Sequence, residues 1–596
     1  MAKQRNDAPA FKGRWNNFAK EPEVLKSGKR SVIKRLWRYM SAYRKDMIIG
    51  MLASLGIVSI NVASPYLIGL GIDRIANGDI PGLMKAVSIL FVLNFIISYF
   101  VWLQGKYMTR AAQGAVRDLR RDLFARIQRL PLRYFDSRPK GDLMSRMTND
   151  ADTISSTLGD SISQLITSVC FLVGTFCVML KLNVIMACIC MTTMPLVFVT
   201  GRIIAAKSRK NFKKRQADLG VLNSVIQESI GNNRAVISLG LGKHVISKTE
   251  AAAEDLKGDA IRALIAVGVM GPCMNMFRNL NIAITAGAGA YLAAKDIVTV
   301  GMVATMITYA ERVSRPLNEI ANVYGTIQSA IAGAARVFEV LDEPRETDDE
   351  TDTDVDFVKG DVIFDNVTFG YDPDKVVLKN ISFDAPAGKQ TALVGTTGAG
   401  KTTVINLLTR FYDIDSGVIT VDGKDIRDIN RDSLRSKLGI VLQDTYLFTG
   451  TVADNIRYGK PDATDEEVRE AARLANAAPF IEKMPLGYRT VLADSGSNLS
   501  HGQRQLLAIA RTILADPSIL ILDEATSSVD TLTEKYIQDA FRALMKGRTT
   551  FIIAHRLNTI READEILVLE NGEIVERGSH GDLISAGGTY ARLYKS

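Results

Sequence analysis

A run of glycine and threonine residues around one lysine, GTTGAGKTT at 395–403, has residue types and spacing suited to holding phosphate. Glycines let a backbone turn tightly and direct its N–H groups at phosphate oxygens. In such a loop Lys401 reaches the β- and γ-phosphates, and the Thr402 hydroxyl binds Mg²⁺. Apolar residues at 390–394 predict a strand before the loop, and 404–409 predict a helix after it. The predicted nucleotide-binding residues are Gly395, Thr396, Thr397, Gly398, Ala399, Gly400, Lys401, Thr402 and Thr403.

Two adjacent acids follow a second apolar run at 519–522. A continuous β-branched run of this kind is typical of a central parallel strand that is covered on both faces. Asp523 at its end can hold the Mg²⁺ of a phosphate-binding loop. Glu524 has the reach and basicity to orient and deprotonate an attacking water. Two acids after a strand can also form an ordinary exposed turn, but the upstream loop favours the catalytic interpretation.

Several further motifs follow in a fixed order: IVLQD at 440–444, LSHGQ at 499–503, ILILDEATSSVD at 519–530 and IIAHRL at 552–557. With the phosphate-binding loop, they resemble the ATP-binding cassette (ABC) transporters of the exporter kind. In that family one membrane domain is fused to one nucleotide-binding domain. The resemblance covers nearly the whole chain, and it implies an ATPase that uses ATP and Mg²⁺.

The resemblance also implies a role for each motif residue. Tyr371 corresponds to the aromatic residue that stacks on adenine, and Gln443 to the glutamine that binds Mg²⁺ and faces the membrane domain. His555 corresponds to the switch histidine, a second catalytic candidate beside Glu524. Asp530 corresponds to the D-loop residue. The signature motif, which closes over the partner's γ-phosphate, corresponds to Ser500, His501, Gly502 and Gln503. Taken singly, Tyr371 and His555 would more often be a surface aromatic and a hydrogen-bonded histidine.

Apolar residues make up 47% of the chain and are concentrated before residue 330. A membrane-spanning helix needs about 20 mostly apolar residues. Six candidate spans lie at 47–70, 84–104, 160–180, 183–205, 263–294 and 300–325. Buried helices of a large soluble protein are the alternative, and the length and low charge of the first, third and fourth spans disfavour it. The expected fold class is a six-span α-helical transmembrane domain followed by an α/β P-loop NTPase domain.

Lysine and arginine are concentrated before the first span and in the long connections after the second and fourth spans. This bias predicts that both termini, both long connections and the nucleotide-binding domain are cytoplasmic, in a multi-pass protein of a bacterial cell membrane. The net charge of +8 requires no nucleic-acid partner, because the basic residues lie near the membrane surface. We expect a cytoplasmic segment with a basic helix at 1–45, a transmembrane domain at 46–341, an acidic linker at 342–358 and a nucleotide-binding domain at 359–596.

Two connections resemble the coupling helices of exporters, at 134–150 and, more loosely, at 231–241. All five cysteines lie inside candidate spans, so a disulfide or zinc framework is not expected. Ionisable and amide side chains at membrane depth usually pair or face a cavity. Such residues occur in the fifth and sixth spans, although those of the sixth can also lie near the cytoplasmic surface. They are Asn275, Arg278, Asn279 and Asn281 in the fifth span, and Glu311, Arg312, Arg315 and Glu319 in the sixth.

The resemblance implies ATP-driven export of hydrophobic or amphipathic compounds, of the multidrug type, by alternating access across the lipid bilayer. A lipid or oligosaccharide flippase shares the architecture and stays open as the alternative. One phosphate-binding loop and one signature per chain require a second half-transporter. His501 stands where the family usually has glycine, and 493–498 lacks the usual Glu-Arg-Gly run. These departures favour a heterodimer, with a homodimer as the alternative.

Overall fold

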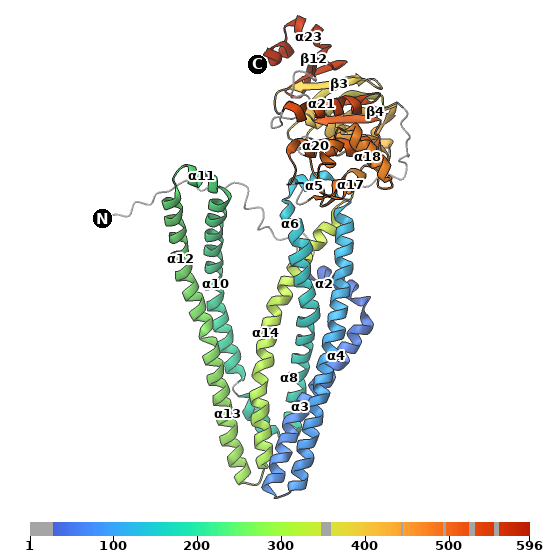
Figure 1. The fold of residues 1–596 in the computed structure, drawn as a ribbon. Coiled ribbons are helices and arrows are strands. Elements are labelled where there is room, and N and C mark those ends of the chain that lie inside the picture. Colours follow the sequence, from blue (N-terminus) through green and yellow to red (C-terminus); the bar gives the residue numbers. More distant parts are fainter. Residues whose placement is uncertain are drawn as a thin grey trace, which may run out of the picture. The chain divides into compact units, whose positions relative to one another are not determined.

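The computed structural model of the chain describes residues 28–192, 194–346, 359–372, 374–442, 445–492, 496, 498–523, 531–553 and 560–595. These residues form two compact units, shown in Figure 1. The helical unit contains the chain up to Gln128 and then Lys140–Glu343. The α/β unit contains Arg129–Pro139 and the chain from Pro344 onward. The units therefore do not follow chain order, because a short segment between two helices of the first unit belongs to the second.

The longest helices of the helical unit far exceed the mean of about 11–12 residues in globular proteins. Helix α4 has 48 residues. At 1.5 Å per residue such a helix is about 70 Å long, more than twice the bilayer core of about 30 Å. The helices are α2 (Lys29–Ser41), α3 (Arg44–Ala76), α4 (Ile80–Ile127), α6 (Lys140–Ser145), α7 (Ala151–Ser156), α8 (Ile162–Leu182), α9 (Val184–Met191), α10 (Met194–Gly231), α11 (Asn233–Ser238), α12 (Gly242–Gly268), α13 (Met270–Ala294) and α14 (Val300–Asp342), with π-helical turns η2 (Arg146–Asp150) and η3 (Thr157–Ser161).

In the described part of the chain, four helical segments are long and apolar enough to cross a membrane: Arg44–Ala76, Ile80–Ile127, Lys140–Leu182 and Gly242–Ala294. They contain the predicted spans at 47–70, 84–104, 160–180 and 263–294. The predicted spans at 183–205 and 300–325 are not among them. Helix α9 ends at Met191, which shortens the first, and Glu311, Arg312 and Arg315 bring charge into the second.

Helices α3 and α4 lie side by side, and α14 packs against both α3 and α8 (Figure 1). The contact of α3 with α14 requires glycine, because a Cβ on Gly301 would be 2.1 Å from the carbonyl oxygen of Gly69. Deeper in the same contact the buried Tyr309 hydroxyl donates to the Val62 carbonyl over 2.6 Å. The bond satisfies a polar group that would be costly to bury unpaired.

Apolar β-branched runs form the central sheet of the α/β unit, in the order β12-β11-β3-β10-β9-β6. Strands β3, β10, β9, β6 and β11 are parallel, and β12 pairs antiparallel with β11. An antiparallel sheet has the order β2-β1-β4-β5, and β7 pairs with β8. The strands are β1 (Val362–Phe369), β2 (Leu378–Ala385), β3 (Gln390–Gly395), β4 (Ser416–Val421), β5 (Lys424–Asp425), β6 (Leu438–Val441), β7 (Gly450–Thr451), β8 (Val491–Leu492), β9 (Ile519–Asp523), β10 (Thr549–Ile553), β11 (Glu565–Glu570) and β12 (Glu573–Gly578).

Helices cover the central sheet because its buried strands have apolar side chains on both faces. The longest are α20 (His501–Ala515) and α21 (Thr531–Met545), which pack on each other. The shorter helices are α5 (Leu132–Ser137), α15 (Lys401–Leu408), α16 (Arg431–Ser436), α17 (Val452–Arg457), α18 (Asp465–Leu474), α19 (Ala478–Ile481), α23 (His580–Ala586) and α24 (Thr589–Lys595), with 3₁₀ turns η4 (Ile426–Asp428) and η5 (Gly487–Arg489).

Candidate functional site

The glycine-threonine loop joins β3 to the start of α15. Gly400 caps this helix with φ +105°, and Gly398 has φ +87°. Both angles lie in a region that side chains with a Cβ rarely enter, which explains glycine at these positions. Residues that follow Gly400 open α15, so the helix N-terminus with its unpaired N–H groups faces the loop. Such a terminus attracts phosphate.

Lys401 folds back over this loop. Its Nζ donates to the carbonyl oxygens of Gly395, over 2.7 Å, and Thr396, over 3.0 Å. The residue is only 7% exposed. Burial lowers the pKa of Lys401, and the carboxylate of Asp523 opposes this shift. A triphosphate at this loop would supply the negative charge that the buried ammonium group favours.

Asp523 reaches the loop through strand pairing. Strand β10 lies between β3 and β9, with Ile553 opposite both Leu393 and Asp523. The carboxyl ends of parallel strands share one edge of the sheet, where ligands of open α/β sheets bind. Thr402 is exposed at the start of α15. A hydroxyl and a carboxylate are oxygen donors suited to Mg²⁺, so Thr402 and Asp523 fit this metal.

Tyr371 lies after β1 and contacts α15. Its hydroxyl accepts from Asn406 Nδ2 over 2.9 Å and lies 3.3 Å from Thr403 Oγ1. Its ring meets Tyr412 edge to face, with ring centroids 4.9 Å apart and planes at 89°. The side chain is half-buried. The predicted base platform is therefore fixed to the helix that begins at the phosphate-binding loop.

The predicted signature forms the N-terminus of α20. Ser500 caps the helix, and its Oγ accepts from the Gln503 N–H over 3.3 Å. Gln503 Oε1 accepts from the Ser500 N–H over 3.0 Å, which completes a capping box. Gly502 is buried. His501 is half-buried, and its Nδ1 is shielded from solvent without a hydrogen-bond partner among the described residues.

Among the described residues, no hydrogen bond or ion pair joins 500–503 to 395–403. Four predicted site residues, Gln443, Glu524, Asp530 and His555, lie outside the described part of the chain. Their roles stay predictions. Glu524 follows the last residue of β9, and His555 follows β10 by two residues, so the two strands that precede them are neighbours in the sheet.

The predicted coupling segment at 134–150 divides between the two units. Helix α5 belongs to the α/β unit, whereas the chain from Lys140 belongs to the helical unit. Within the α/β unit, the Tyr412 hydroxyl donates to Asp136 of α5, and Arg133 Nη2 donates to the Tyr371 carbonyl over 3.3 Å. The sequence analysis did not identify Tyr412. A tyrosine just after a helix gives no local signal of a partner in residues 132–137.

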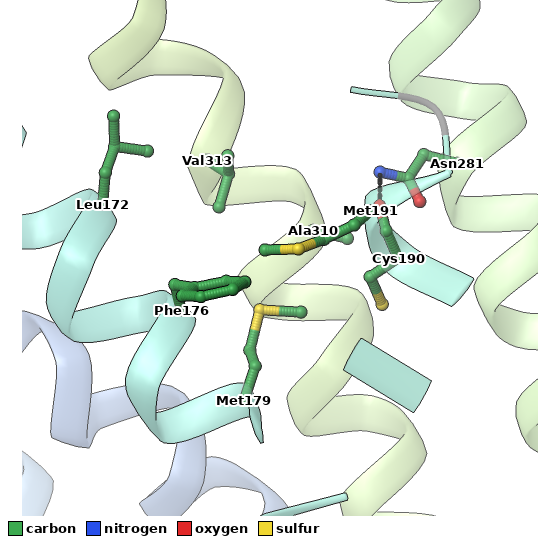
Figure 2. Close-up of a pocket in the computed structure, with 8 residues that line it drawn as sticks. All are labelled: Leu172, Phe176, Met179, Cys190, Met191, Asn281, Ala310 and Val313. Atoms are coloured by element: carbon green, nitrogen blue, oxygen red, sulfur yellow. Dashed lines mark hydrogen bonds between the residues drawn. The ribbon is translucent and has the colours of Figure 1, made fainter. Parts of the chain in front are cut away.

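The helical unit contains a small, partly open pocket between α8, α9, α13 and α14 (Figure 2), with a cavity volume of about 30 Å³. Sulfur-containing and apolar side chains dominate its lining, which consists of Leu172, Phe176, Met179, Cys190, Met191, Asn281, Ala310 and Val313. Asn281 Nδ2 donates to the Cys190 carbonyl over 3.1 Å, and Asn281 Oδ1 accepts from Thr285 over 3.2 Å. The amide thereby satisfies a carbonyl in the last turn of α9, which ends at Met191.

Two of the ionisable residues predicted at membrane depth pair with each other. Arg315 Nε donates to Glu319 Oε1 over 3.0 Å, one turn along α14. The other carboxylate oxygen of Glu319 accepts from Ser168 of α8 over 2.7 Å. These charges therefore fasten α14 to α8, as expected for ionisable groups in membrane helices.

Comparisons with known proteins agree with this arrangement. Residues 47–317 match the ABC transporter transmembrane region, and residues 378–527 match the ABC transporter family. An uncharacterized ABC transporter ATP-binding protein of Bacillus subtilis is 42% identical, over 95% of this chain and 94% of that protein. A fatty acid ABC transporter ATP-binding/permease protein of Mycobacterium bovis is 39% identical, over 90% of this chain and 85% of that protein.

A solved structure of a bacterial Atm1-family ABC exporter with ATP bound is also similar. It has a TM-score of 0.76 and 31% identity, over 93% of this chain and 98% of that one. This similarity covers both the helical unit and the α/β unit, so it does not depend on an isolated motif. The chain thus belongs to the ABC transporter family, as a membrane protein whose helical domain is followed by an ATP-hydrolysing nucleotide-binding domain.

Proposed function

We propose that this chain is one half of a dimeric exporter, which uses ATP to move amphipathic compounds out of the cell by alternating access. The observation that carries the proposal is the edge where β3, β10 and β9 bring the phosphate-binding loop, the buried Lys401 and Asp523 together, in a chain that also has membrane-spanning helices. A loop of this kind alone indicates only a nucleotide; the helices indicate what hydrolysis drives.

At this edge each residue has a distinct task. Lys401 releases the loop carbonyls and binds the β- and γ-phosphates, while the N–H groups of residues 395–403 hold the remaining oxygens. Thr402, Asp523 and Gln443 would hold Mg²⁺, which supplies charge neutralisation on the phosphates. Glu524 accepts a proton from the attacking water. His555 is a second catalytic residue beside it.

Dimerisation follows from what one chain lacks. Its signature at 500–503 forms no hydrogen bond or ion pair with its own phosphate-binding loop among the described residues, and the family resemblance pairs each signature with the partner's nucleotide. Helix α11 and its flanks also expose large apolar side chains: Ile237 is 73% exposed and Leu239 is 70% exposed. A second chain would cover this surface, which water otherwise contacts.

A heterodimer is the finer proposal. His501 has an imidazole at a position where the family usually keeps glycine, close to the partner's bound ATP. Its Nδ1 is shielded from solvent and has no partner among the described residues, so the imidazole edge that remains exposed is the part that would face the partner. In a heterodimer only the partner's nucleotide meets this imidazole, whereas the intact Glu524 of this chain works against the partner's signature. A homodimer would place His501 in both sites.

We further propose six spans, with both termini and the nucleotide-binding domain cytoplasmic in a bacterial cell membrane. The domain division is 1–45, 46–341, 342–358 and 359–596. Four spans meet length and apolarity criteria. Residues 183–205 and 300–325 would supply the other two spans. Neighbouring helices can pair their charged side chains and the backbone groups left open where α9 ends, as Ser168 of α8 does for Glu319.

The pocket in Figure 2 supports an amphipathic or hydrophobic substrate, because its Met179 and Met191 side chains adapt their shape to apolar groups. The Asn281 amide already bonds to the Cys190 carbonyl and to Thr285, so the lining offers few polar contacts to a substrate. The fatty acid transporter among the relatives fits the same chemistry. A lipid flippase is the alternative function, since an acyl chain needs the same lining.

The test is Glu524→Gln in purified, reconstituted protein. The amide keeps the shape of the carboxyl group but cannot take a proton, so we expect ATP binding to persist while steady-state hydrolysis is lost. Glu573→Gln on the exposed face of β12 is the matched control and should hydrolyse ATP normally. Turnover of Glu524→Gln within a few-fold of the parent would exclude Glu524 as the base.

The assembly is tested by purifying the chain alone and measuring its mass and turnover. A poorly active homodimer that gains drug-stimulated hydrolysis with a second half-transporter supports the heterodimer. A stable homodimer with robust transport into inverted vesicles would defeat it.

A further inference from the structure

Helix α5 is joined to the nucleotide-binding fold by side chains around Tyr371. The helix comes from the chain between α4 and α6 but belongs to the α/β unit. Its Arg133 donates to the Tyr371 carbonyl over 3.3 Å. Its Asp136 accepts from the Tyr412 hydroxyl. The first contact therefore ends on Tyr371, the predicted adenine platform, and the second ends on Tyr412, whose ring contacts Tyr371.

The second of these contacts continues through aromatic rings. Tyr412 packs edge to face on Tyr371, with ring centroids 4.9 Å apart. The ring centroid of Phe369 lies 5.0 Å from that of Tyr371 and 5.7 Å from that of Tyr412. Aromatic pairs at these distances have preferred geometries, so one ring cannot tilt freely without moving the other. The three rings form one cluster, called here the aromatic cluster, packed against the core of the α/β unit.

The other side of Tyr371 is tied to the phosphate-binding helix. Asn406 and Thr403 of α15 contact its hydroxyl. Tyr371 is thus held between α15 and the aromatic cluster. Its carbonyl accepts from Arg133 of α5, and the Tyr412 hydroxyl bonds to Asp136 of the same helix. Burial, followed by the hydrogen bond to Asp136, raises the pKa of Tyr412, so the hydroxyl stays a proton donor over the physiological range.

We propose that Tyr412 is a positioning residue that links a base bound on Tyr371 to α5, so that α5 responds to the nucleoside part of the ligand and not to its phosphates alone. The inference rests on the proposed function, in which Tyr371 stacks on adenine. A base on Tyr371 restricts its ring, the edge-to-face contact orients Tyr412, and the hydroxyl bond carries that orientation to Asp136. Triphosphate without a base contacts only residues 395–403, so it reaches Tyr371 through Thr403 but does not restrict the Tyr371 ring by stacking on it.

The test compares ATP with inorganic tripolyphosphate on the full-length chain in lipid nanodiscs, with EDTA to prevent turnover. The five native cysteines are replaced, and an environment-sensitive fluorophore is attached to Ser137→Cys at the exposed end of α5. Tyr412→Phe removes the hydroxyl and keeps the ring. Asp136→Ala removes the acceptor from the other side. Tyr458→Phe is the matched control, because Tyr458 stacks on Phe448, away from the cluster.

In the parent and in Tyr458→Phe we expect ATP to shift the fluorescence of α5 more than tripolyphosphate does. In Tyr412→Phe and Asp136→Ala the ATP response should fall to the tripolyphosphate level, while the Kd for ATP stays within about threefold of the parent. The double variant should show no further fall, because both single changes break one bond. A purely structural role of Tyr412 would lower both responses together.

Two results would overturn the inference: an ATP response of Tyr412→Phe equal to that of the parent, or equal responses of the parent to ATP and tripolyphosphate. Failure of the proposed function looks different. If Tyr371→Ala leaves the affinity for ATP unchanged, Tyr371 is not the base platform, and the inference fails with it. If Tyr371→Ala weakens ATP binding but the Tyr412 and Asp136 variants respond like the parent, only the link to α5 is wrong.

Discussion

Replacing Gly400 by alanine should impair ATP binding more than the same change at Gly398 of the loop. At φ +105° a residue with a Cβ is strained by about 1–2 kcal/mol. The new Cβ would also lie 2.6 Å from Cδ2 of Leu378. Leu378 is fully buried in the core of the α/β unit, so it cannot turn away freely. Overpacking of this kind costs about 1–3 kcal/mol.

The two costs add to about 2–5 kcal/mol, and the loop relieves them by moving the start of α15. Since each 1.4 kcal/mol is about tenfold in affinity, the Kd for ATP should rise by roughly 30-fold or more. Gly398→Ala has the same kind of strain at φ +87° but no atom within 4 Å of the new Cβ. Gly388→Ala, at φ +72° between β2 and β3, is also free of contacts and lies outside the loop.

Titration of each purified variant with ATP, beside thermal unfolding, separates these contributions. We expect the Kd to rise in the order Gly388→Ala, Gly398→Ala, Gly400→Ala, and Gly388→Ala to lose only stability, by about 1 kcal/mol. Equal affinities of the Gly400 and Gly398 variants would refute the argument from the Leu378 contact. Parent-like affinity in both would show that the loop does not hold the phosphates.

Arg146→Gln should destabilise the helical unit by about 2–3 kcal/mol, because the Arg146 side chain is only 8% exposed and its loss leaves two acids unpaired. Arg120→Gln is the control: its partner is 70% exposed, so the free energy of unfolding should change by no more than about 0.5 kcal/mol. Equal apparent Tm values of the two variants would contradict this. Hydrogen bonds from Thr451 hold the pKa of Asp454 below 3.8, so its contribution to stability is complete above that value and is lost as the pH falls through the lower folded-state pKa. Asp454→Asn should therefore show a smaller loss of stability between pH 7 and pH 3 in denaturant titrations, and an unchanged pH profile would exclude the contribution. A single cysteine at position 79 should react with an impermeant reagent added outside, and one at position 348 should react only when the reagent is inside. Labelling of position 348 from outside would refute the topology.

Local patterns predicted the parts of the nucleotide site that depend on neighbours in sequence. The apolar run before Gly395 forms β3, and Asp523 ends β9, as expected from runs of buried residues. The resemblance to ABC exporters and the helical domain followed by an α/β domain are confirmed by the family matches. These features were predictable because each is encoded within a short stretch of sequence.

Contacts between distant segments were not predictable in this way. Asp136 and Tyr412 are 276 residues apart, and no periodicity links them. In the predicted coupling segment at 134–150 the helical pattern breaks at Pro139, but the sequence does not show that α5, before this residue, belongs to one unit and η2, after it, to the other. The end of α9 at Met191 was likewise not predicted, because residues 183–205 are mostly apolar and the Asn281 amide of α13, which donates to the Cys190 carbonyl, is 91 residues away in the sequence.

Helix α15 is fastened at both ends to segments that lead to the helical unit. Near its start, Thr403 and Asn406 hold Tyr371, whose carbonyl accepts from α5. Beyond its end, Arg435 donates to the carbonyls of residues 409 and 410, over 3.2 and 2.8 Å.

The same guanidinium forms a bidentate pair with Glu346, over 2.9 and 2.6 Å, just after α14. The Glu346 N–H in turn donates to the Arg129 carbonyl, just before α5, over 2.8 Å. The chain segments that enter and leave the α/β unit are thus bonded to each other and to the end of α15. Bidentate arginine pairs fix orientation as well as distance. Phosphate bound at the start of α15 and a base bound on Tyr371 would therefore both act on residues that are bonded to these connections.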